Sequence, residues 1–302
     1  MTERLDLRNA LRNEGFSGAL IAECPLAPHT TWRIGGPAEL LAVPESRDDL
    51  VLAVRWAAGR GIPWRVLGNG SNLLVRDIGV RGLVLRMRKV LDDLDCHAGV
   101  LAAGAGASFP AAARVAAAAG LAGIEFGGGI PGTVGGAIVM NAGWHEHEIG
   151  AHVIDVDYLD AAGRIRTYTA DACRFGYRTS RFRGDGGVVL STRLDLRPDD
   201  PAAVRARMEK YAASRKANQP TELPSCGSVF LKPPGDFAGR LIEEAGLKGA
   251  RVGGVQVSPK HANFFINDDN ATAADVLELV VRVESEVERQ FGVRLEREFE
   301  LW

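Results

Sequence analysis

The pattern of apolar and polar positions divides the chain into helical and extended segments. Apolar residues that recur every three to four positions predict helices at residues 3–14, 46–59, 109–119, 202–217, 236–246 and 272–290. Ser46 and Ser108 precede two of these helices, where a side-chain oxygen can cap the first turn. Short apolar or alternating runs predict strands at residues 39–43, 64–68, 73–77, 82–87, 100–106, 152–160, 164–170, 188–198, 228–232, 252–257, 262–267 and 295–302.

The order of these elements predicts two regions. Up to residue 198, strands alternate with helices, and the turn Asp160–Gly163 joins two strands as a hairpin. Pro198, Asp199, Asp200 and Pro201 then form a cluster of residues that break regular structure. The last hundred residues have strands and helices of their own. We therefore expect a domain boundary near residue 200.

Two glycine-rich turns are the first candidates for a binding site. Residues 68–72 read GNGSN, and residues 127–143 read GGGIPGTVGGAIVMNAG. Both lie near the ends of predicted strands, where free backbone N–H groups can bind a pyrophosphate. Neither turn has the spacing of a Rossmann or a P-loop motif. A single turn of this kind is more often structural, but the pair favours a dinucleotide site.

Composition and charge exclude several classes of function. Hydrophobic residues make up 46% of the 302 residues and charged residues 25%, which is typical of a soluble globular enzyme. A net charge of −2 gives no electrostatic basis for binding nucleic acid or an anionic membrane. The small-residue run 111–124 is too short and too weakly apolar to span a bilayer, and Arg114 interrupts it. The first residues carry charges and no signal-peptide core, so we expect a cytoplasmic protein.

The sequence predicts no metal site and no disulfide. Cys24, Cys96, Cys173 and Cys226 are scattered without paired spacing. The segment HEHE at 145–148 looks like a metal cluster, but no third ligand is spaced to complete a coordination shell.

Several motifs, in order along nearly the whole chain, resemble the UDP-N-acetylenolpyruvoylglucosamine reductase family of peptidoglycan precursor synthesis. They are TTWRIGGPAELLAVP (30–44), VLGNGSNLLV (66–75), GIPGTVGGAIVMNAG (129–143), YRTSRF (177–182), SCGSVFLKP (225–233), AGRLIEEAGLKG (238–249), VSPKHANFFIN (257–267) and LEREFEL (295–301). No long insertion follows YRTSRF, so the chain resembles the compact form, which lacks a tyrosine-bearing loop.

The resemblance implies an α+β fold of two domains. A two-lobed FAD-binding domain of the vanillyl-alcohol-oxidase (PCMH) type precedes a smaller α/β substrate-binding domain. The expected divisions are residues 1–29 as helix and lead-in, 30–200 as FAD domain with lobes at about 30–87 and 88–200, and 201–302 as substrate domain. The strand 295–302 is expected to return to the active site. We also expect a monomer.

The resemblance further implies a reaction and its catalytic residues. NADPH reduces FAD, and the reduced flavin gives hydride to the methylene carbon of the enolpyruvyl group. Arg178 matches the family's catalytic arginine, whose permanent charge can stabilise the enediolate that develops. Ser228 matches the proton donor, and Glu298 matches the catalytic glutamate. Outside the motif context, an ion-paired surface arginine, a turn serine and a solvated acidic face would be the better interpretations.

Binding residues follow from the same motifs. For FAD they are Gly68, Asn69, Gly70, Ser71, Asn72, Gly129, Ile130, Pro131, Gly132, Thr133, Gly135, Gly136, Asn141 and Ala142. For the uridine diphosphate sugar they are Tyr177, Lys232, Lys260, His261 and Asn263, and ordinary solvated surface is the alternative for Lys232, Lys260 and His261. The chain has LKPP where the family commonly has lysine-asparagine-proline, which leaves the pyrophosphate contact within 231–233 open.

Two other functions remain open at this point. Another FAD-dependent oxidoreductase, such as an alcohol or lactone oxidase, would explain the N-terminal half but not SCGSVF, KHANF and the terminal glutamate together. A flavin or nucleotide sensor without catalysis would need none of the three catalytic residues.

Overall fold

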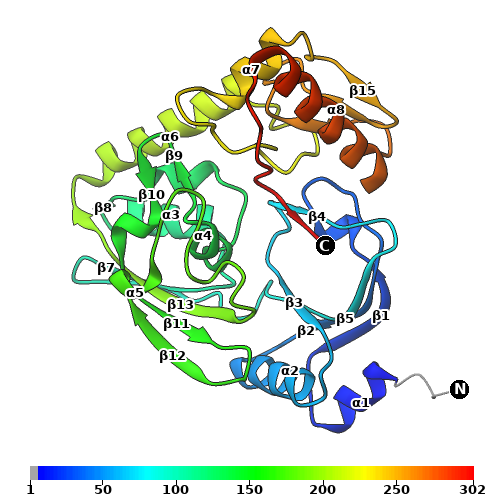
Figure 1. Cartoon of the computed structure of the whole chain (residues 1–302). Coiled ribbons are helices and arrows are strands. Elements are labelled where there is room, and N and C mark those ends of the chain that lie inside the picture. The colour runs from blue at the N-terminus through cyan, green and yellow to red at the C-terminus, as the bar shows by residue number, and fades with distance from the viewer. Residues whose placement is uncertain (1–5) are drawn as a thin grey trace, which may run out of the picture. The chain divides into compact units, whose positions relative to one another are not determined.

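The computed structural model describes residues 6–302, and they form two compact units (Figure 1). The first unit takes the described part of Met1–Glu23, with Glu39–Gly68 and Arg81–Ala213. The second unit takes Cys24–Ala38, Asn69–Val80 and Ser214–Trp302. Two short N-terminal segments therefore belong with the C-terminal residues rather than with their sequence neighbours.

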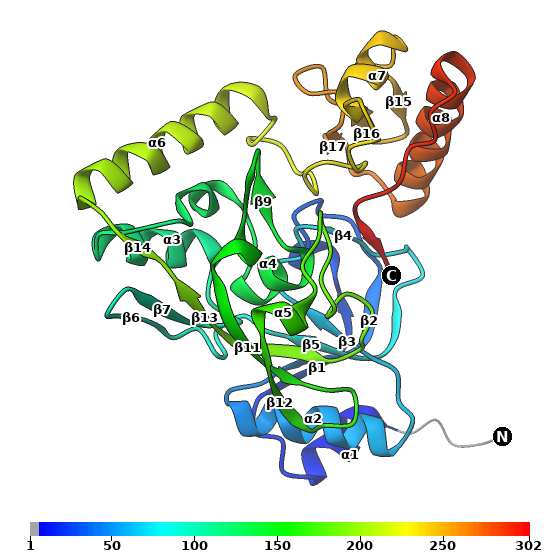
Figure 2. The ribbon, with the colours of Figure 1, turned by 60° about the vertical axis from the view of Figure 1, so that its left-hand side comes forward.

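The first lobe of the first unit is a four-stranded sheet with two helices beside it (Figure 2). Its strand order is β1 (Ala19–Pro25), β2 (Pro37–Val43), β5 (Val80–Arg86) and β3 (Trp64–Leu67), with β3 parallel to β5. The helices are α1 (Leu7–Asn13) and α2 (Arg47–Gly59). Ser46 caps α2 by accepting a hydrogen bond from the Asp49 N–H at 3.0 Å, as the sequence predicts.

The second lobe is a five-stranded antiparallel sheet with small helices. Its order is β12 (Ile165–Thr169), β11 (Val153–Leu159), β13 (Val188–Asp195), β7 (Val100–Gly104) and β6 (Leu94–His97). Its other elements are α3 (Phe109–Ala118), β8 (Leu121–Ala122), η2 (Glu125–Gly129), α4 (Val134–Met140), β9 (Gly143–Trp144), β10 (His147–Glu148), η3 (Ile149–His152), α5 (Ala170–Cys173), β14 (Arg197–Pro198) and α6 (Pro201–Asn218). Alanines line the buried face of α3, so the helix packs closely on its neighbours.

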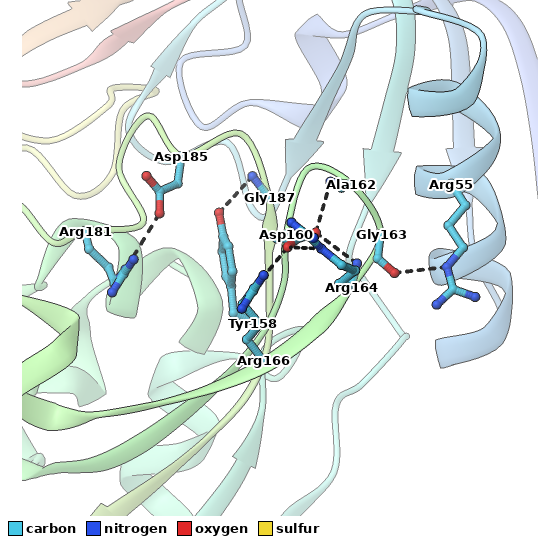
Figure 3. Close-up of polar contacts among 10 residues, drawn as sticks. All are labelled: Arg55, Tyr158, Asp160, Ala162, Gly163, Arg164, Arg166, Arg181, Asp185 and Gly187. Carbon is cyan, nitrogen blue, oxygen red and sulfur yellow. Dashed lines mark hydrogen bonds and ion pairs between the residues drawn. The ribbon is translucent and has the colours of Figure 1, made fainter.

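The two lobes of this unit are joined by a common apolar core and by the β11–β12 hairpin of the second lobe, which contacts α2 of the first. Leu159, Val188 and Leu190 of the second sheet are buried in the apolar cluster of the first lobe. At the turn between β11 and β12, Asp160 accepts hydrogen bonds from backbone and side chain of Arg164, and these lower the pKa of its carboxyl to about 2 (Figure 3). The same turn presents the Gly163 carbonyl to Arg55 Nε of α2 at 2.9 Å.

The second unit collects three separate stretches of chain around one apolar core. Its elements are η1 (Ala27–His29), β4 (Leu73–Leu74), α7 (Ala238–Glu244), β15 (Arg251–Val252), β16 (Val255–Val257), β17 (Phe265–Asn267), α8 (Ala273–Phe291) and β18 (Glu300–Leu301). Trp32 is fully buried there, and its Nε1 donates to the Phe265 carbonyl at 2.8 Å. The C-terminal β18 pairs with β4 in parallel, with Glu300 opposite Leu73.

Most predicted elements are confirmed, and three predicted strands differ in extent. The predicted helices coincide with α2, α3, α6, α7 and α8; α1 covers Leu7–Asn13 of the predicted 3–14, and residues 3–5 lie outside the described residues. Residues 228–232 form no continuous strand, because Ser228 bridges to Phe264 whereas Phe230 bridges to Arg297. Of residues 295–302, Glu300–Leu301 is the strand β18. The predicted strand 252–257 is a hairpin, in which Val252 ends β15, residues 253 and 254 turn, and β16 follows.

Candidate active site

The turn at residues 68–72 offers backbone groups, and not a cluster of side chains, to a ligand. Gly68 approaches Thr133 so closely that a Cβ would lie 2.8 Å from Thr133 Oγ1. Gly70 has φ +62°, and a Cβ there would lie 2.5 Å from the His29 carbonyl oxygen. Within residues 6–302, no hydrogen bond of the protein uses the backbone N–H groups of residues 69–72. These N–H groups fit the anionic pyrophosphate of a dinucleotide such as FAD.

The second glycine-rich segment runs from a turn into the short helix α4. Thr133 caps α4, and its Oγ1 accepts from the Gly136 N–H at 3.2 Å. Gly135 packs against Ala105, where a Cβ would be 2.9 Å from the alanine methyl carbon. Pro131 and Gly136 are exposed, whereas Thr133 and Gly135 are buried. Pro131 and Gly136 therefore face outward, while the backbone N–H groups of Ile130, Gly132, Val134 and Gly135 donate to carbonyls of the protein.

Ser228 and Glu298, 70 positions apart in the sequence, lie on neighbouring extended segments of the second unit. Val229 is the link between them, because its carbonyl accepts from the Glu298 N–H at 2.9 Å. Two residues on, the Leu231 N–H donates to the Glu296 carbonyl at 2.8 Å. Both Ser228 and Glu298 are half-buried.

The carboxylate of Glu298 acts electrostatically on the segment that carries Ser228. Burial raises the pKa of the Cys226 thiol well above its ordinary value, and the negative charge of Glu298 raises it further. Asn72 of the first glycine-rich turn holds the same strand: its Nδ2 donates to the Glu298 carbonyl at 3.2 Å, and its carbonyl accepts from the Glu300 N–H at 2.9 Å. Part of the predicted cofactor turn therefore supports the predicted catalytic glutamate.

Asn263 makes internal contacts rather than facing outward. Its side chain accepts from the Phe230 N–H at 3.0 Å and donates to the Phe230 carbonyl at 2.8 Å. Only 7% of Asn263 is exposed, and its own carbonyl accepts from the Val229 N–H at 2.8 Å. These contacts fix the backbone beside Ser228. The sequence expectation of a substrate contact for Asn263 stays untested, but its amide is already engaged by the protein.

The other predicted substrate residues occupy separate surroundings. Lys232 Nζ lies 4.4 Å from the centre of the exposed Phe237 ring. Lys260 Nζ donates to the Lys216 carbonyl at 2.7 Å. Burial lowers the pKa of His261, whose Nδ1 accepts from the Asn263 N–H at 3.2 Å. His261 is therefore a neutral ring near pH 7. The exposed aromatic ring of Phe237 is a surface feature that the motif comparison does not single out.

Arg178 lies in the first unit, on a tight turn. Gly176 and Thr179 exchange hydrogen bonds of 3.0 and 3.1 Å, so Tyr177 and Arg178 are the central residues of the turn. The guanidinium of Arg178 donates from Nη2 to the Gly143 carbonyl at 3.0 Å. It also lies 5.2 Å from the ring centre of Tyr177, which is half exposed.

The HEHE segment forms a hairpin, not a metal centre. Trp144 pairs with His147 in β9 and β10, and His145 and Glu146 make the turn. The His147 ring stacks on Phe126 with ring centres 6.0 Å apart. Among residues 6–302, no group of three His, Cys, Asp or Glu side chains is placed to hold a metal ion. The four cysteines are free thiols, and no helix in the described part of the chain has the length and apolarity to cross a membrane.

Comparison with known proteins agrees with this arrangement. Residues 38–169 match the family described as FAD binding domain, and residues 219–302 match the family described as UDP-N-acetylenolpyruvoylglucosamine reductase, C-terminal domain. The UDP-N-acetylenolpyruvoylglucosamine reductase of Moorella thermoacetica is 50% identical over 95% of this chain and 95% of its own length. The corresponding protein of Heliobacterium modesticaldum is 45% identical over 94% of this chain and 90% of its own length.

A solved structure covers nearly the same residues. The crystal structure of UDP-N-acetylenolpyruvylglucosamine reductase from Thermus caldophilus is 39% identical, covers 94% of this chain and 98% of its own, and has a TM-score of 0.80. The FAD-binding domain and the C-terminal unit with Ser228 and Glu298 define a two-domain, FAD-dependent oxidoreductase. The chain belongs to the UDP-N-acetylenolpyruvoylglucosamine reductase family. The expected α+β fold, with a PCMH-type FAD domain before a smaller domain, is confirmed.

Proposed function

We propose that this chain reduces the enolpyruvyl group of UDP-N-acetylglucosamine enolpyruvate to give UDP-N-acetylmuramate, with NADPH as reductant and FAD as cofactor, in peptidoglycan precursor synthesis. The observation that carries the proposal is the pairing of Ser228 and Glu298 through Val229. It lies inside the region that matches the reductase C-terminal domain. An alcohol or lactone oxidase built on the same FAD domain would not require Ser228 and Glu298.

The backbone N–H groups of residues 69–72 are proposed to hold FAD together with residues 129–136, which would offer packing contacts more than free N–H donors. When bound, FAD supplies the hydride that the methylene carbon of the enolpyruvyl group receives. Asn141 and Ala142, also predicted as cofactor contacts, lie at the C-terminal end of α4.

Three side chains of this chain are proposed to act on the substrate. Hydride addition at the methylene carbon places negative charge on the α-carbon and its carboxylate. Arg178 is proposed to bind that carboxylate, because its planar guanidinium offers two parallel donors and a permanent charge. Ser228 Oγ donates the proton that the α-carbon takes up. Glu298, charged in the protein alone, is proposed to take up a proton in the complex and to stabilise the enediolate by donating a hydrogen bond.

The uridine diphosphate is proposed to lie against Tyr177, Lys232, Lys260 and His261. Lys232 follows Ser228 by four residues, which in extended chain is about 13 Å. That distance suits a charged contact to the pyrophosphate while the enolpyruvyl group lies at Ser228. Asn263 belongs to the same predicted set, although its side-chain amide bonds the backbone of Phe230.

The organisation of the chain is part of the proposal. We propose residues 1–29 as lead-in, 30–200 as FAD domain and 201–302 as substrate domain along the sequence, with residues 24–38 and 69–80 packed in the compact unit of the C-terminal residues. The two family matches end and begin at 169 and 219, on either side of that boundary. The protein is proposed to be a cytoplasmic monomer. Light scattering of the purified holoprotein at two concentrations measures its mass against the 32.3 kDa of the chain.

The test of the function follows the flavin absorbance without oxygen. NADPH is expected to bleach the bound flavin, and UDP-N-acetylglucosamine enolpyruvate is expected to restore its colour, whereas UDP-N-acetylglucosamine is not. Ser228→Ala should be bleached normally and reoxidised at least 100-fold more slowly. Ser285→Ala, an exposed serine of α8, is the matched control. Bleaching by an alcohol but not by NADPH would replace the proposal with the oxidase alternative.

A further inference from the structure

Arg178 has a backbone conformation that its side chain does not favour. Its φ is +53°, at the second central position of the turn Gly176–Thr179. Glycine or asparagine usually occupies such a position. For a residue with a Cβ, the left-handed region brings the Cβ too close to the following carbonyl oxygen and is unfavourable. Backbone strain of this kind persists where the surrounding structure holds the residue in place, and it is concentrated at functional sites.

A buried asparagine holds the turn. Asn141 is 1% exposed, and its Nδ2 donates to the Gly176 carbonyl at 2.9 Å. The same Nδ2 donates to Glu148 Oε2 at 2.8 Å, and Oδ1 accepts from the Gly150 N–H at 2.9 Å. An amide nitrogen has two hydrogens to donate. Both are therefore engaged inside this unit, at partners 7 and 35 positions away in the sequence.

The side chain of Arg178 is also held in place through Asn141. The guanidinium donates to the Gly143 carbonyl, and Gly143 is the residue that pairs with Glu148 across β9 and β10. Asn141 thus bonds both the turn that carries the Arg178 backbone and the hairpin that receives the Arg178 side chain. Asn141 itself ends α4 in the left-handed region, with φ +44° and ψ +55°.

We propose that Asn141 is a positioning residue for Arg178. Its amide joins the turn 176–179 to the hairpin 143–148, and this sets where the guanidinium meets the substrate carboxylate. The inference rests on the proposed function, since it takes Arg178 as the group that binds the substrate. It replaces the sequence expectation that the Asn141 side chain contacts FAD.

The two candidate roles of Asn141, contact with FAD and positioning of Arg178, affect different half-reactions. A cofactor contact would change flavin retention or the bleaching by NADPH. A positioning residue for Arg178 changes only the reoxidation of the flavin by the enolpyruvyl sugar. Asn141→Asp has nearly the same shape, tolerates the left-handed backbone and still accepts from Gly150. It places an oxygen against the Gly176 carbonyl and the Glu148 carboxylate, so both donated bonds are lost.

The experiment measures both half-reactions by stopped flow without oxygen. We expect Asn141→Asp to slow reoxidation at least tenfold, with bleaching and flavin content within twofold of the wild type. Asn141→Gly serves if the added charge prevents folding, because glycine suits the end of a helix and adds no repulsion. Asn270→Asp is the matched control: Asn270 is exposed, also has positive φ at +50°, and should leave both rates unchanged.

A readout without cofactor tests the same contact. The Thr179 N–H bonds to the Gly176 carbonyl that Asn141 holds. Hydrogen exchange of peptides covering 175–181 in the flavin-free protein should therefore be at least tenfold faster in Asn141→Gly than in wild type. Unchanged exchange, or slower bleaching in place of slower reoxidation, overturns the positioning role.

Arg178→Ala separates this inference from the proposed function. If Arg178→Ala slows reoxidation and the Asn141 variants do not, the inference is wrong and the proposed function stands. If Arg178→Ala leaves reoxidation unchanged, the catalytic assignment of Arg178 itself is wrong. If both roles are correct, the double variant Asn141→Gly/Arg178→Ala should be no slower than Arg178→Ala alone, because the asparagine acts through the arginine.

Discussion

Replacing Asn263 by alanine is expected to destabilise the protein rather than to weaken substrate binding alone. The substitution removes two hydrogen bonds, to the N–H and the carbonyl of Phe230. Phe230 is 1% exposed, so water does not replace the lost partners. An unsatisfied buried polar group costs about 1–3 kcal/mol. With partial relaxation, the free energy of unfolding should fall by about 2–4 kcal/mol.

The assay is urea unfolding of the holoprotein, followed by flavin and tryptophan fluorescence. In thermal unfolding, the same change should lower the melting temperature by about 4–16 °C, from about 2–4 °C per kcal/mol. Asn263→Asp keeps the acceptor for the Phe230 N–H and should fall between alanine and wild type. Asn218→Ala is the control, because that exposed side chain bonds only Ser214 of its own helix.

A pure substrate contact gives a different result. In that case Asn263→Ala raises KM, while the free energy of unfolding stays within 0.5 kcal/mol of the wild type, the usual range of a surface substitution. This outcome would refute the reasoning that the Asn263 amide fixes the backbone beside Ser228. Loss of stability together with a lower kcat supports it, since Val229 links that backbone to Glu298.

Three further predictions concern stability. The Asp77 carboxylate accepts hydrogen bonds from the N–H groups of Ala273 and Ala274, at 2.8 and 3.0 Å, at the start of α8. Asp77→Ala should therefore lower the free energy of unfolding by about 1 kcal/mol in urea titration. An unchanged urea midpoint would contradict this stabilising contact. Tyr158 OH accepts from the Gly187 N–H at 2.8 Å, so Tyr158→Phe should cost about 1 kcal/mol in the same titration at pH 7. Burial raises the pKa of Tyr158 to about 12, so this stabilisation should be lost as the pH rises from the ordinary tyrosine value toward the folded value, and a constant cost at alkaline pH would contradict the raised pKa. Burial alone would raise the pKa of Asp49, but hydrogen bonds from Ser17, Glu45 and Gly18 lower it below 3.8. Because the pKa is lower in the folded state than in the unfolded state, the ionised carboxylate stabilises the fold fully above pH 3.8. This stabilisation is lost as the pH falls through the folded pKa. Asp49→Asn should therefore be less stable than wild type at pH 7 and approach it near pH 2, and a constant difference across this range would rule out the linkage.

The sequence predicts local structure well where one segment carries the whole signal. Ser46 before an amphipathic segment predicts α2 and its cap, and the turn Asp160–Gly163 predicts the β11–β12 hairpin. The motifs also predict the family and the FAD domain, because each motif is contiguous. Alternation predicts strands at 228–232 and 295–302. In the structure, Ser228 bridges to Phe264 and Phe230 to Arg297, and of 295–302 Glu300–Leu301 pairs as β18 with β4.

The tertiary structure decides what the asparagines do. In the sequence, Asn72, Asn141 and Asn263 stand inside ligand-binding motifs, and motif position predicts ligand contacts for all three. In the structure, each bonds the main chain next to one predicted catalytic residue: Asn72 the Glu298 carbonyl, Asn141 the turn of Arg178, and Asn263 the backbone after Ser228. Nothing in the local sequence distinguishes an asparagine that contacts a ligand from one that bonds the main chain, because the bonded partners are 226, 35 and 33 positions away.

The sequence by itself therefore determined the kind of protein: a flavoprotein of this reductase family, with Arg178, Ser228 and Glu298 as its expected catalytic residues. Glycine-rich turns, caps and family motifs are contiguous, so a single segment contains each signal. Only the tertiary structure decided that residues 24–38 and 69–80 belong with the C-terminal unit, and that Val229 places Ser228 beside Glu298. These are hydrogen bonds between backbone groups, which every residue carries, so the identities of the residues do not reveal them.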